Sequence, residues 1–198
     1  MTHRAAPARG FTLIELMVTL VLVVALATVA VPSFIAFQRN SELTSISNSL
    51  LASINAARSE AMKRNQHALV TPVSGSNWAG GWRVYVSQRY GSDATTYNES
   101  GSTPDLLIQQ QAALPSYISV STSDSAGTSM GQIRFDGSGY SKNAAGGAFQ
   151  AMTLRVRRTD VPSGQQDAET RIVVVSTSGR VRVCKPSTDT SCTTTTTQ

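Results

Sequence analysis

Two arginines in the stretch STSGRVRVCK, near the C-terminus, have the clearest chemical meaning. The stretch has a period of two, so Arg180 and Arg182 lie on one face of an extended strand. Val181 and Val183 lie on the other face. The two guanidinium groups are then about 6.6 Å apart, and phosphates of one DNA strand advance by about 3.4 Å per nucleotide. The pair predicts contacts with phosphates two nucleotides apart, with Gly179 bringing backbone amides close.

The C-terminal part of the chain is rich in arginine. The chain of 198 residues carries a formal net charge of +5, and arginine favours bidentate contacts with phosphate. The main candidates for nucleic-acid binding are Arg180 and Arg182, helped by Lys185. Weaker candidates are Arg155, Arg157, Arg158 and Arg171. The alternative is the solvated face of an edge strand, where arginine and lysine discourage aggregation.

The sequence offers no catalytic or metal-binding constellation. His3 and His67 stand apart, and neither is placed for a catalytic triad or a metal site. We therefore predict no enzyme, no metal and no cofactor. Cys184 and Cys192 lack the C-x-x-C spacing of a redox or zinc site. A local disulfide that closes a small loop is favoured, and two unpaired thiols are the alternative.

A membrane segment stands near the N-terminus. Every residue from Leu16 to Val31 is apolar or threonine, and Glu15 precedes this run. The basic residues Arg4 and Arg9 place the N-terminus in the cytoplasm and the rest of the chain outside, where a disulfide can persist. A cleaved secretory signal is the alternative, although the run exceeds an ordinary signal core of about 7 to 15 residues.

The helical pattern continues past the apolar run. Leu43, Ile46, Leu50, Ile54, Ala57 and Ala61 recur at steps of three and four, which is typical of a helix that packs on a domain. We predict a membrane helix over 11–37 and its soluble half over 38–66. Pro32 should kink or locally melt this helix.

After His67 the period changes to that of strands. Eight short β-rich stretches alternate with turn residues, which predicts an antiparallel β domain over 67–198 and an α+β fold. These stretches are HALVTPV, GWRVYVSQ, DLLIQQQAAL, YISVSTS, QIRFDG, AMTLRVRR, TRIVVVSTS and GRVRVC. The polar segment from Ser87 to Asp105 predicts a mobile loop, and the threonine-rich C-terminal tail should fray.

The stretch RGFTLIELMV resembles the type III signal of type IV pilins and type II secretion pseudopilins. The resemblance implies that residues 1–10 are a leader, cleaved after Gly10 by a prepilin peptidase. It also implies N-methylation of Phe11. Glu15 would then pair with the N-terminal amine of a neighbouring subunit in the filament, where such a pair fixes register.

Four further stretches, ARSEAMKRN, GW at Gly81, IRFDGSG and TSGRVRV, resemble the GspH/FimT family. The family implies two β-sheets packed on the helix. The element Gly179-Arg180-Val181-Arg182 resembles the DNA-binding motif of the FimT branch, which serves natural transformation. The other branch is the GspH pseudopilin of type II secretion.

The sequence thus predicts a minor pilin that binds extracellular DNA through phosphates. Its expected partners are DNA, other pilin subunits, the prepilin peptidase and the inner membrane. Its expected location is the inner membrane, as a single-pass protein with a periplasmic domain, and the cell surface once it joins a pilus. The alternatives are a GspH-like pseudopilin and a structural minor pilin that primes pilus assembly.

Overall fold

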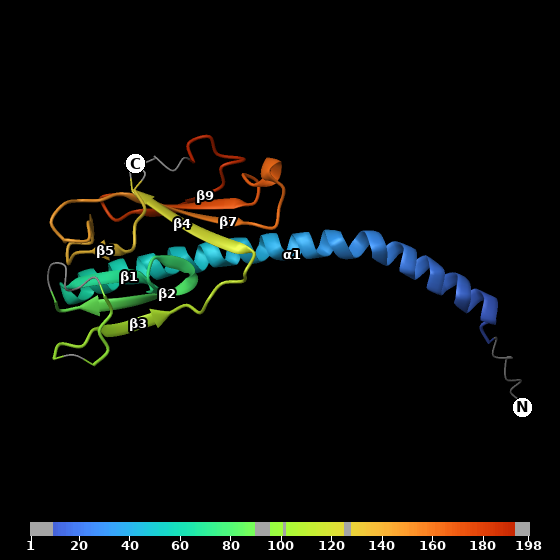
Figure 1. Cartoon of the computed structure of the whole chain (residues 1–198), viewed down its shortest axis with the longest axis horizontal. Helices are drawn as coiled ribbons and strands as arrows, with labels where there is room; N and C mark the ends of the chain where they lie inside the picture. Colours follow the sequence, from blue (N-terminus) through green and yellow to red (C-terminus); the bar gives the residue numbers. More distant parts are fainter. Residues whose placement is uncertain (1–9, 90–95, 101, 125–127, 193–198) are drawn as a thin grey trace, which may run out of the picture. The chain divides into compact units, whose positions relative to one another are not determined.

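A computed structural model describes residues 10–89, 96–100, 102–124 and 128–192 (Figure 1). The chain divides into two compact units, Met1–Ser41 and Glu42–Gln198. The helix α1 (Leu13–Arg64) contributes its first part to one unit and its last part to the other. The leader 1–9 and the tail 193–198 lie outside the described residues, so the predictions for them stay predictions.

The first part of α1 is apolar and exposed. It contains an 18-residue stretch of mean hydropathy 2.6, which is long and apolar enough to cross a membrane. The hydroxyl groups of Thr19 and Thr28 donate to carbonyl groups three residues earlier, so neither is left unsatisfied. The backbone stays helical through Pro32. Pro32 therefore does not melt the helix, and the kink that was predicted as the other possibility stays a prediction.

The last part of α1 buries the predicted stripe. Leu43, Leu50, Ile54, Ala57 and Ala61 are completely buried, and Ile46 is nearly so. Their spacing at three and four residues puts them on one face of the helix. That face is the spine of the second unit.

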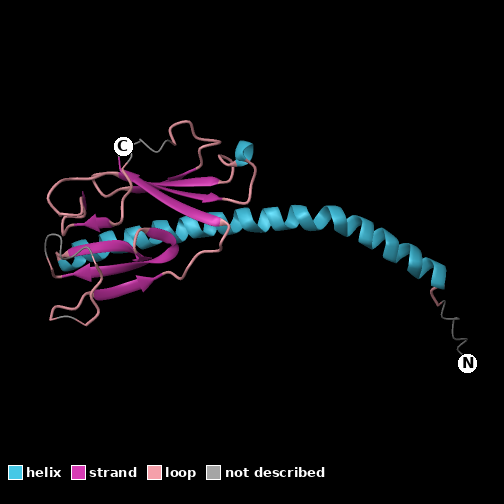
Figure 2. Ribbon diagram, in the orientation of Figure 1, coloured by secondary structure: helices cyan, strands magenta, loops and turns pink. Residues whose placement is uncertain are grey.

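The described residues after α1 form two antiparallel sheets (Figure 2). Sheet A has the strand order β3-β2-β1-β5-β6 and sheet B the order β4-β7-β8-β9. The strands of sheet A are β1 (His67–Ser74), β2 (Asn77–Ser87), β3 (Leu106–Gln110), β5 (Ile133–Phe135) and β6 (Ser141–Lys142). Those of sheet B are β4 (Ile118–Asp124), β7 (Met152–Arg158), β8 (Thr170–Val175) and β9 (Val181–Cys184), and a short 3₁₀ helix spans Ser163–Gln165.

The predicted α+β fold is confirmed. All eight predicted β-rich stretches contain a strand, and only the two-residue β6 was not anticipated. A single core joins the buried face of α1 to the inner faces of both sheets. Trp78 and Trp82 belong to this core, and the Trp82 indole Nε1 donates to Ser53 Oγ on α1 at 2.9 Å.

The described ends of the segment from Ser87 to Asp105 are anchored. Arg89 forms an ion pair of 2.5 Å with the buried carboxylate of Asp105, which also accepts from the Asn98 backbone N–H. The interior residues 90–95 and 101 lie outside the described residues, so mobility there stays a prediction.

Candidate nucleic-acid interface

The turn between β8 and β9 presents the two predicted arginines. Ser176 closes this turn, since its N–H donates to the Arg180 carbonyl at 2.9 Å and its carbonyl accepts from Gly179 N–H at 2.9 Å. The Arg180 N–H donates to Ser176 Oγ at 3.1 Å. Both amides are therefore used within the turn. The expectation that backbone amides near Gly179 reach phosphate is not supported, because each already has a partner.

Gly179 has a structural part in this turn. Its φ of +78° lies in the left-handed region, and it is buried. A β-carbon here would collide with the Gly139 carbonyl oxygen and lie 2.8 Å from Arg58 Nε. Glycine is needed so that the turn can approach its neighbours closely.

Arg58 on α1 fastens the turn to the rest of the unit. Its Nε donates to the Gly139 carbonyl at 3.0 Å, and its Nη2 donates to the Ser178 carbonyl at 3.1 Å. One side chain thus joins the helix, the turn at Gly139 and the β8–β9 turn. Sequence reasoning missed this role, since no local pattern shows that residues 81 and 120 positions apart meet.

The predicted alternation along β9 is confirmed. Val181 and Val183 pack against the core, whereas Arg182 lies opposite Val174 on the outer face of sheet B. Arg180 is exposed, and it has no carboxylate partner among the described residues. Arg182 is partly exposed and lies 3.8 Å from an Asp189 carboxylate oxygen.

The structure places Arg155 and Arg157 on the same outer face as Arg182. Arg155 pairs across from Ile172, and Arg157 pairs across from Thr170. Ile172 packs with Val174 and the two cysteines in a small apolar cluster on the outer face of sheet B, so both arginines point away from the core. Arg157 donates to Ser119 Oγ and to Gln166 Oε1, both neutral groups. The outer face of sheet B therefore carries three arginines, and Arg180 lies next to it in the β8–β9 turn.

Two other weak candidates have structural partners instead. Arg158 is 5% exposed and forms ion pairs with Asp160 at 2.9 Å and Glu169 at 3.2 Å. Its hydrogen bonds to Asp160, more than those to Glu169, raise its pKa. Arg171 donates to backbone carbonyls and to Thr44 Oγ1 on α1. Burial lowers the pKa of Arg171. These donors are occupied within the unit.

A disulfide joins Cys184 to Cys192, as the sequence favoured. The loop that it closes is ordered by Asp189, whose carboxylate accepts from the Ser191 hydroxyl at 2.6 Å and from its N–H at 2.9 Å. These hydrogen bonds, the hydroxyl first, lower the pKa of Asp189. The Lys185 carbonyl accepts from two N–H groups of the loop, at Thr188 and Asp189. Lys185 thus starts a hydrogen-bonded, disulfide-closed loop whose Asp189 lies close to Arg182.

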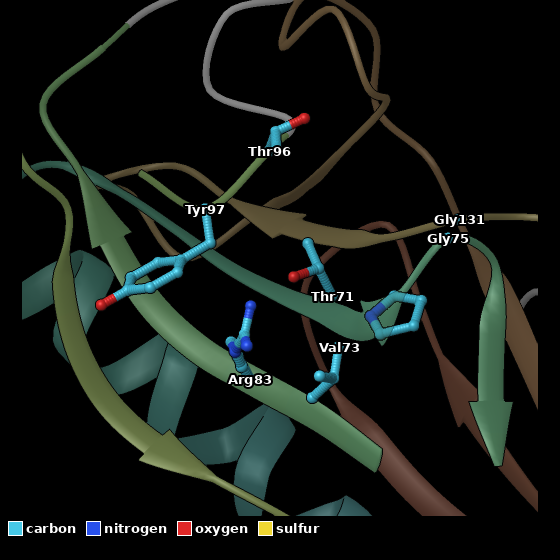
Figure 3. A pocket seen from close by; sticks show the side chains of 8 residues that line it. Thr71, Val73, Gly75, Arg83, Thr96, Tyr97 and Gly131 are labelled. Carbon is cyan, nitrogen blue, oxygen red and sulfur yellow. The ribbon is translucent and has the colours of Figure 1, made fainter. Parts of the chain in front are cut away.

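A small cavity of about 220 Å³ lies over β1 and β2 of sheet A (Figure 3). Its most polar feature is Arg83, which lies 5.3 Å from the Tyr97 ring centroid and donates to Gln110 Oε1 at 3.1 Å. Thr71 is the strand neighbour of Arg83 in this cavity. The lining residues that the structure describes provide no nucleophile with an adjacent base, and so no catalytic arrangement is seen among them. Among the described residues, no cluster of metal-ligating side chains is found.

The N-terminal candidates belong to the other unit. Gly10 and Phe11 precede α1, and both are exposed. Thr12 caps the helix, because its hydroxyl accepts from the Glu15 backbone N–H at 3.3 Å. Glu15 stands in the first helical turn, where a carboxylate is favoured by the helix dipole. In the structure, Thr12 and Glu15 thus take part in the N-terminal cap of α1.

Comparisons with known proteins find one match in the N-terminal region and one in the rest of the chain. Residues 47–191 match the family model of the type II transport protein GspH, and residues 6–31 match the prokaryotic N-terminal methylation motif. No curated protein matches the chain.

A solved structure of the type IV minor pilin FimU from Pseudomonas aeruginosa shares the fold. It is similar with a TM-score of 0.53 and 16% identity, covering 76% of this chain and 94% of FimU. A second crystal form gives a TM-score of 0.46 and 13% identity, covering 76% and 93%. Because the GspH match spans most of the sequence, the chain belongs to the GspH/FimT-like family of type IV pilins and pseudopilins.

Proposed function

We propose that this protein is a minor pilin of a type IV pilus that binds extracellular DNA for uptake in natural transformation. The observation that carries the proposal is the arginine surface of sheet B. Arg182, Arg155 and Arg157 share its outer face, and Arg180 stands exposed at its corner. Guanidinium groups that share one face of a sheet offer several positive charges and bidentate donors to a phosphate backbone.

The ion pair between Arg182 and Asp189 is compatible with this role. Its 3.8 Å separation and its exposure, 36% for Arg182 and 38% for Asp189, make it a weak surface pair. A phosphate can replace Asp189 as the partner of Arg182 at small cost. Lys185 adds a further positive charge next to the disulfide. Arg158 and Arg171 contribute less, since their donors are already engaged.

Assembly of the protein follows from its N-terminal motif. In this proposal a prepilin peptidase cleaves after Gly10, Phe11 becomes the methylated N-terminus, and Glu15 pairs with the amine of a neighbouring pilin. Before assembly, residues 11–37 span the inner membrane, 38–66 continue the helix, and 67–198 form a periplasmic domain. In the assembled pilus that domain is at the cell surface.

The family match also favours a second candidate. The matching family model is described as the GspH protein of type II transport, so a minor pseudopilin of a secretion system is the alternative. Its work would be protein–protein assembly, and the arginines would then be a solvated strand face. If the protein is instead a structural minor pilin that primes pilus assembly, it is likewise expected not to bind DNA.

DNA binding by the full chain in nonionic detergent separates these functions. Fluorescence anisotropy with a labelled duplex at low and moderate salt would compare the wild type with Arg180→Gln/Arg182→Gln. The wild type should bind without sequence preference and weaken steeply with salt. The double variant should bind more weakly to every sequence, and its salt slope should fall by roughly two, one unit per lost phosphate contact.

Arg83→Gln is the matched control, because it removes an arginine charge from sheet A and leaves sheet B intact. It should retain nearly full affinity. A folded wild type that fails to bind DNA at low salt would rule out the proposal and favour the pseudopilin or assembly role. Equal affinity of the double variant and the wild type would show that the site is elsewhere.

A further inference from the structure

Two exposed aromatic side chains stand on the segment that packs against the β8–β9 turn. Tyr140 is 44% exposed and Phe149 is 59% exposed. In the described part of the unit Glu42–Gln198, they are the aromatic residues that present most surface to solvent. Trp78 and Trp82 are buried in the core and cannot stack on a ligand.

The backbone around Tyr140 contacts the arginine-bearing turn on both sides. Before it, the Gly139 carbonyl lies against Gly179. After it, the Ser141 N–H donates to the Thr177 carbonyl at 3.0 Å. Tyr140 is therefore held next to the residues that immediately precede Arg180, although the two segments are far apart in the sequence.

Phe149 extends this aromatic surface. Its ring centroid is 5.2 Å from that of Tyr140, with an interplanar angle of 63°. The ammonium group of Lys142 lies over one face of the Phe149 ring, 3.7 Å from the centroid. More than half of the Phe149 side chain is still exposed to solvent.

This pair also has a local structural part. Phe149 forms a β-bridge with Lys142, so the rings help to close the hairpin that follows β6. Closing a hairpin does not by itself require two exposed rings, and single exposed apolar side chains are common on protein surfaces. The arrangement here differs because the segment that carries both rings contacts the β8–β9 turn through its backbone, and the exposed Arg180 follows that turn. Aromatic faces beside cationic groups form the usual binding surface for single-stranded nucleic acid.

We infer that the site takes single-stranded DNA, with Arg180 and Arg182 on the phosphates and Tyr140 and Phe149 stacked on bases. This inference rests on the proposed function and names its ligand. In a duplex the base faces are already stacked on one another, so the rings have nothing to bind. Single strands expose those faces, and stacking tolerates any sequence.

The test compares single-stranded and duplex DNA on the same protein. The full chain in nonionic detergent is titrated into a labelled thymidine oligonucleotide of about 12 nucleotides and into a duplex of equal length. The variant Tyr140→Leu/Phe149→Leu removes the rings but keeps apolar contact in the hairpin. Tyr140→Phe keeps both rings and is the matched control.

The Leu variant should bind the single strand about tenfold more weakly or worse, and its duplex affinity should change by less than about twofold, since phosphate contacts remain. Tyr140→Phe should bind like the wild type. A 2-aminopurine base in the single strand should change its fluorescence on binding the wild type but not the Leu variant. Thermal unfolding verifies that each variant is folded.

Several results would overturn the inference while leaving DNA binding in place. These are a wild type that binds only the duplex, a Leu variant with unchanged affinity for the single strand, and equal losses for both ligands. Equal losses for both ligands would mean that the two rings only stabilise the β8–β9 turn and do not stack on bases. A wild type that binds neither ligand would instead overturn the proposed function itself.

Discussion

Replacing Gly179 by alanine tests whether this glycine shapes the arginine turn rather than contacts DNA. The φ of +78° is a conformation that alanine adopts at a cost of about 1 to 2 kcal/mol. The added β-carbon would also meet the Gly139 carbonyl and Arg58 Nε. Relief requires that the turn move away from α1.

Such a movement would break hydrogen bonds of Arg58. Each hydrogen bond to a charged group contributes about 1.5 to 3 kcal/mol, and Arg58 makes two to the turns at Gly139 and Ser178. If one is lost, the sum with the backbone cost is about 2.5 to 5 kcal/mol. For a domain of this size that sum lowers the melting temperature by roughly 5 to 20 °C.

The assay is thermal unfolding followed by tryptophan fluorescence, because Trp78 and Trp82 are both buried in the affected unit. Gly164→Ala is the control, since nothing lies within 4 Å of a β-carbon there and its φ is not in the left-handed range. The control should unfold like the wild type. If Gly179→Ala also unfolds within about 2 °C of the wild type, the turn is not packed as argued and the reasoning fails.

Two further predictions concern stability. The variant Cys184→Ser/Cys192→Ser should lose roughly 2.5 kcal/mol of unfolding free energy, because the bridge closes a loop between cysteines 8 residues apart. Reductant should lower the melting temperature of the wild type and leave that of the variant unchanged. Equal melting temperatures of both proteins in oxidant would contradict this prediction. Burial lowers the pKa of His67 in the folded protein below its ordinary value of 6.5. The unfolded chain therefore binds the proton more readily, and the free energy of unfolding decreases as the pH falls from about 6.5 through the folded pKa. His67→Gln should therefore lose less stability than the wild type between about pH 7.5 and about pH 5, and parallel losses would show that His67 is not the responsible group.

The sequence by itself determined the architecture and the nature of the candidate site. The apolar run before Pro32 and the stripe from Leu43 to Ala61 predicted helix on both sides of Pro32, because the first is long enough to span a membrane and the second has helical spacing. The strands followed from period-two stretches between turn residues. It was also predictable that Arg182 lies on the other face of β9 from Val181 and Val183, since alternation is a local property of an extended chain.

Only the tertiary structure decided which arginines are available. Alternation along β7 puts Arg155 and Arg158 on opposite faces, but only the packing of sheet B decides that the first points outward and the second pairs with two carboxylates. The contact of Arg58 with Gly139 and Ser178, and that of Tyr140 with the turn before Arg180, join segments far apart in the chain. Such contacts depend on how α1 and the two sheets pack together. A local sequence pattern cannot encode them, because it reports periodicity along the chain and not which distant surfaces meet.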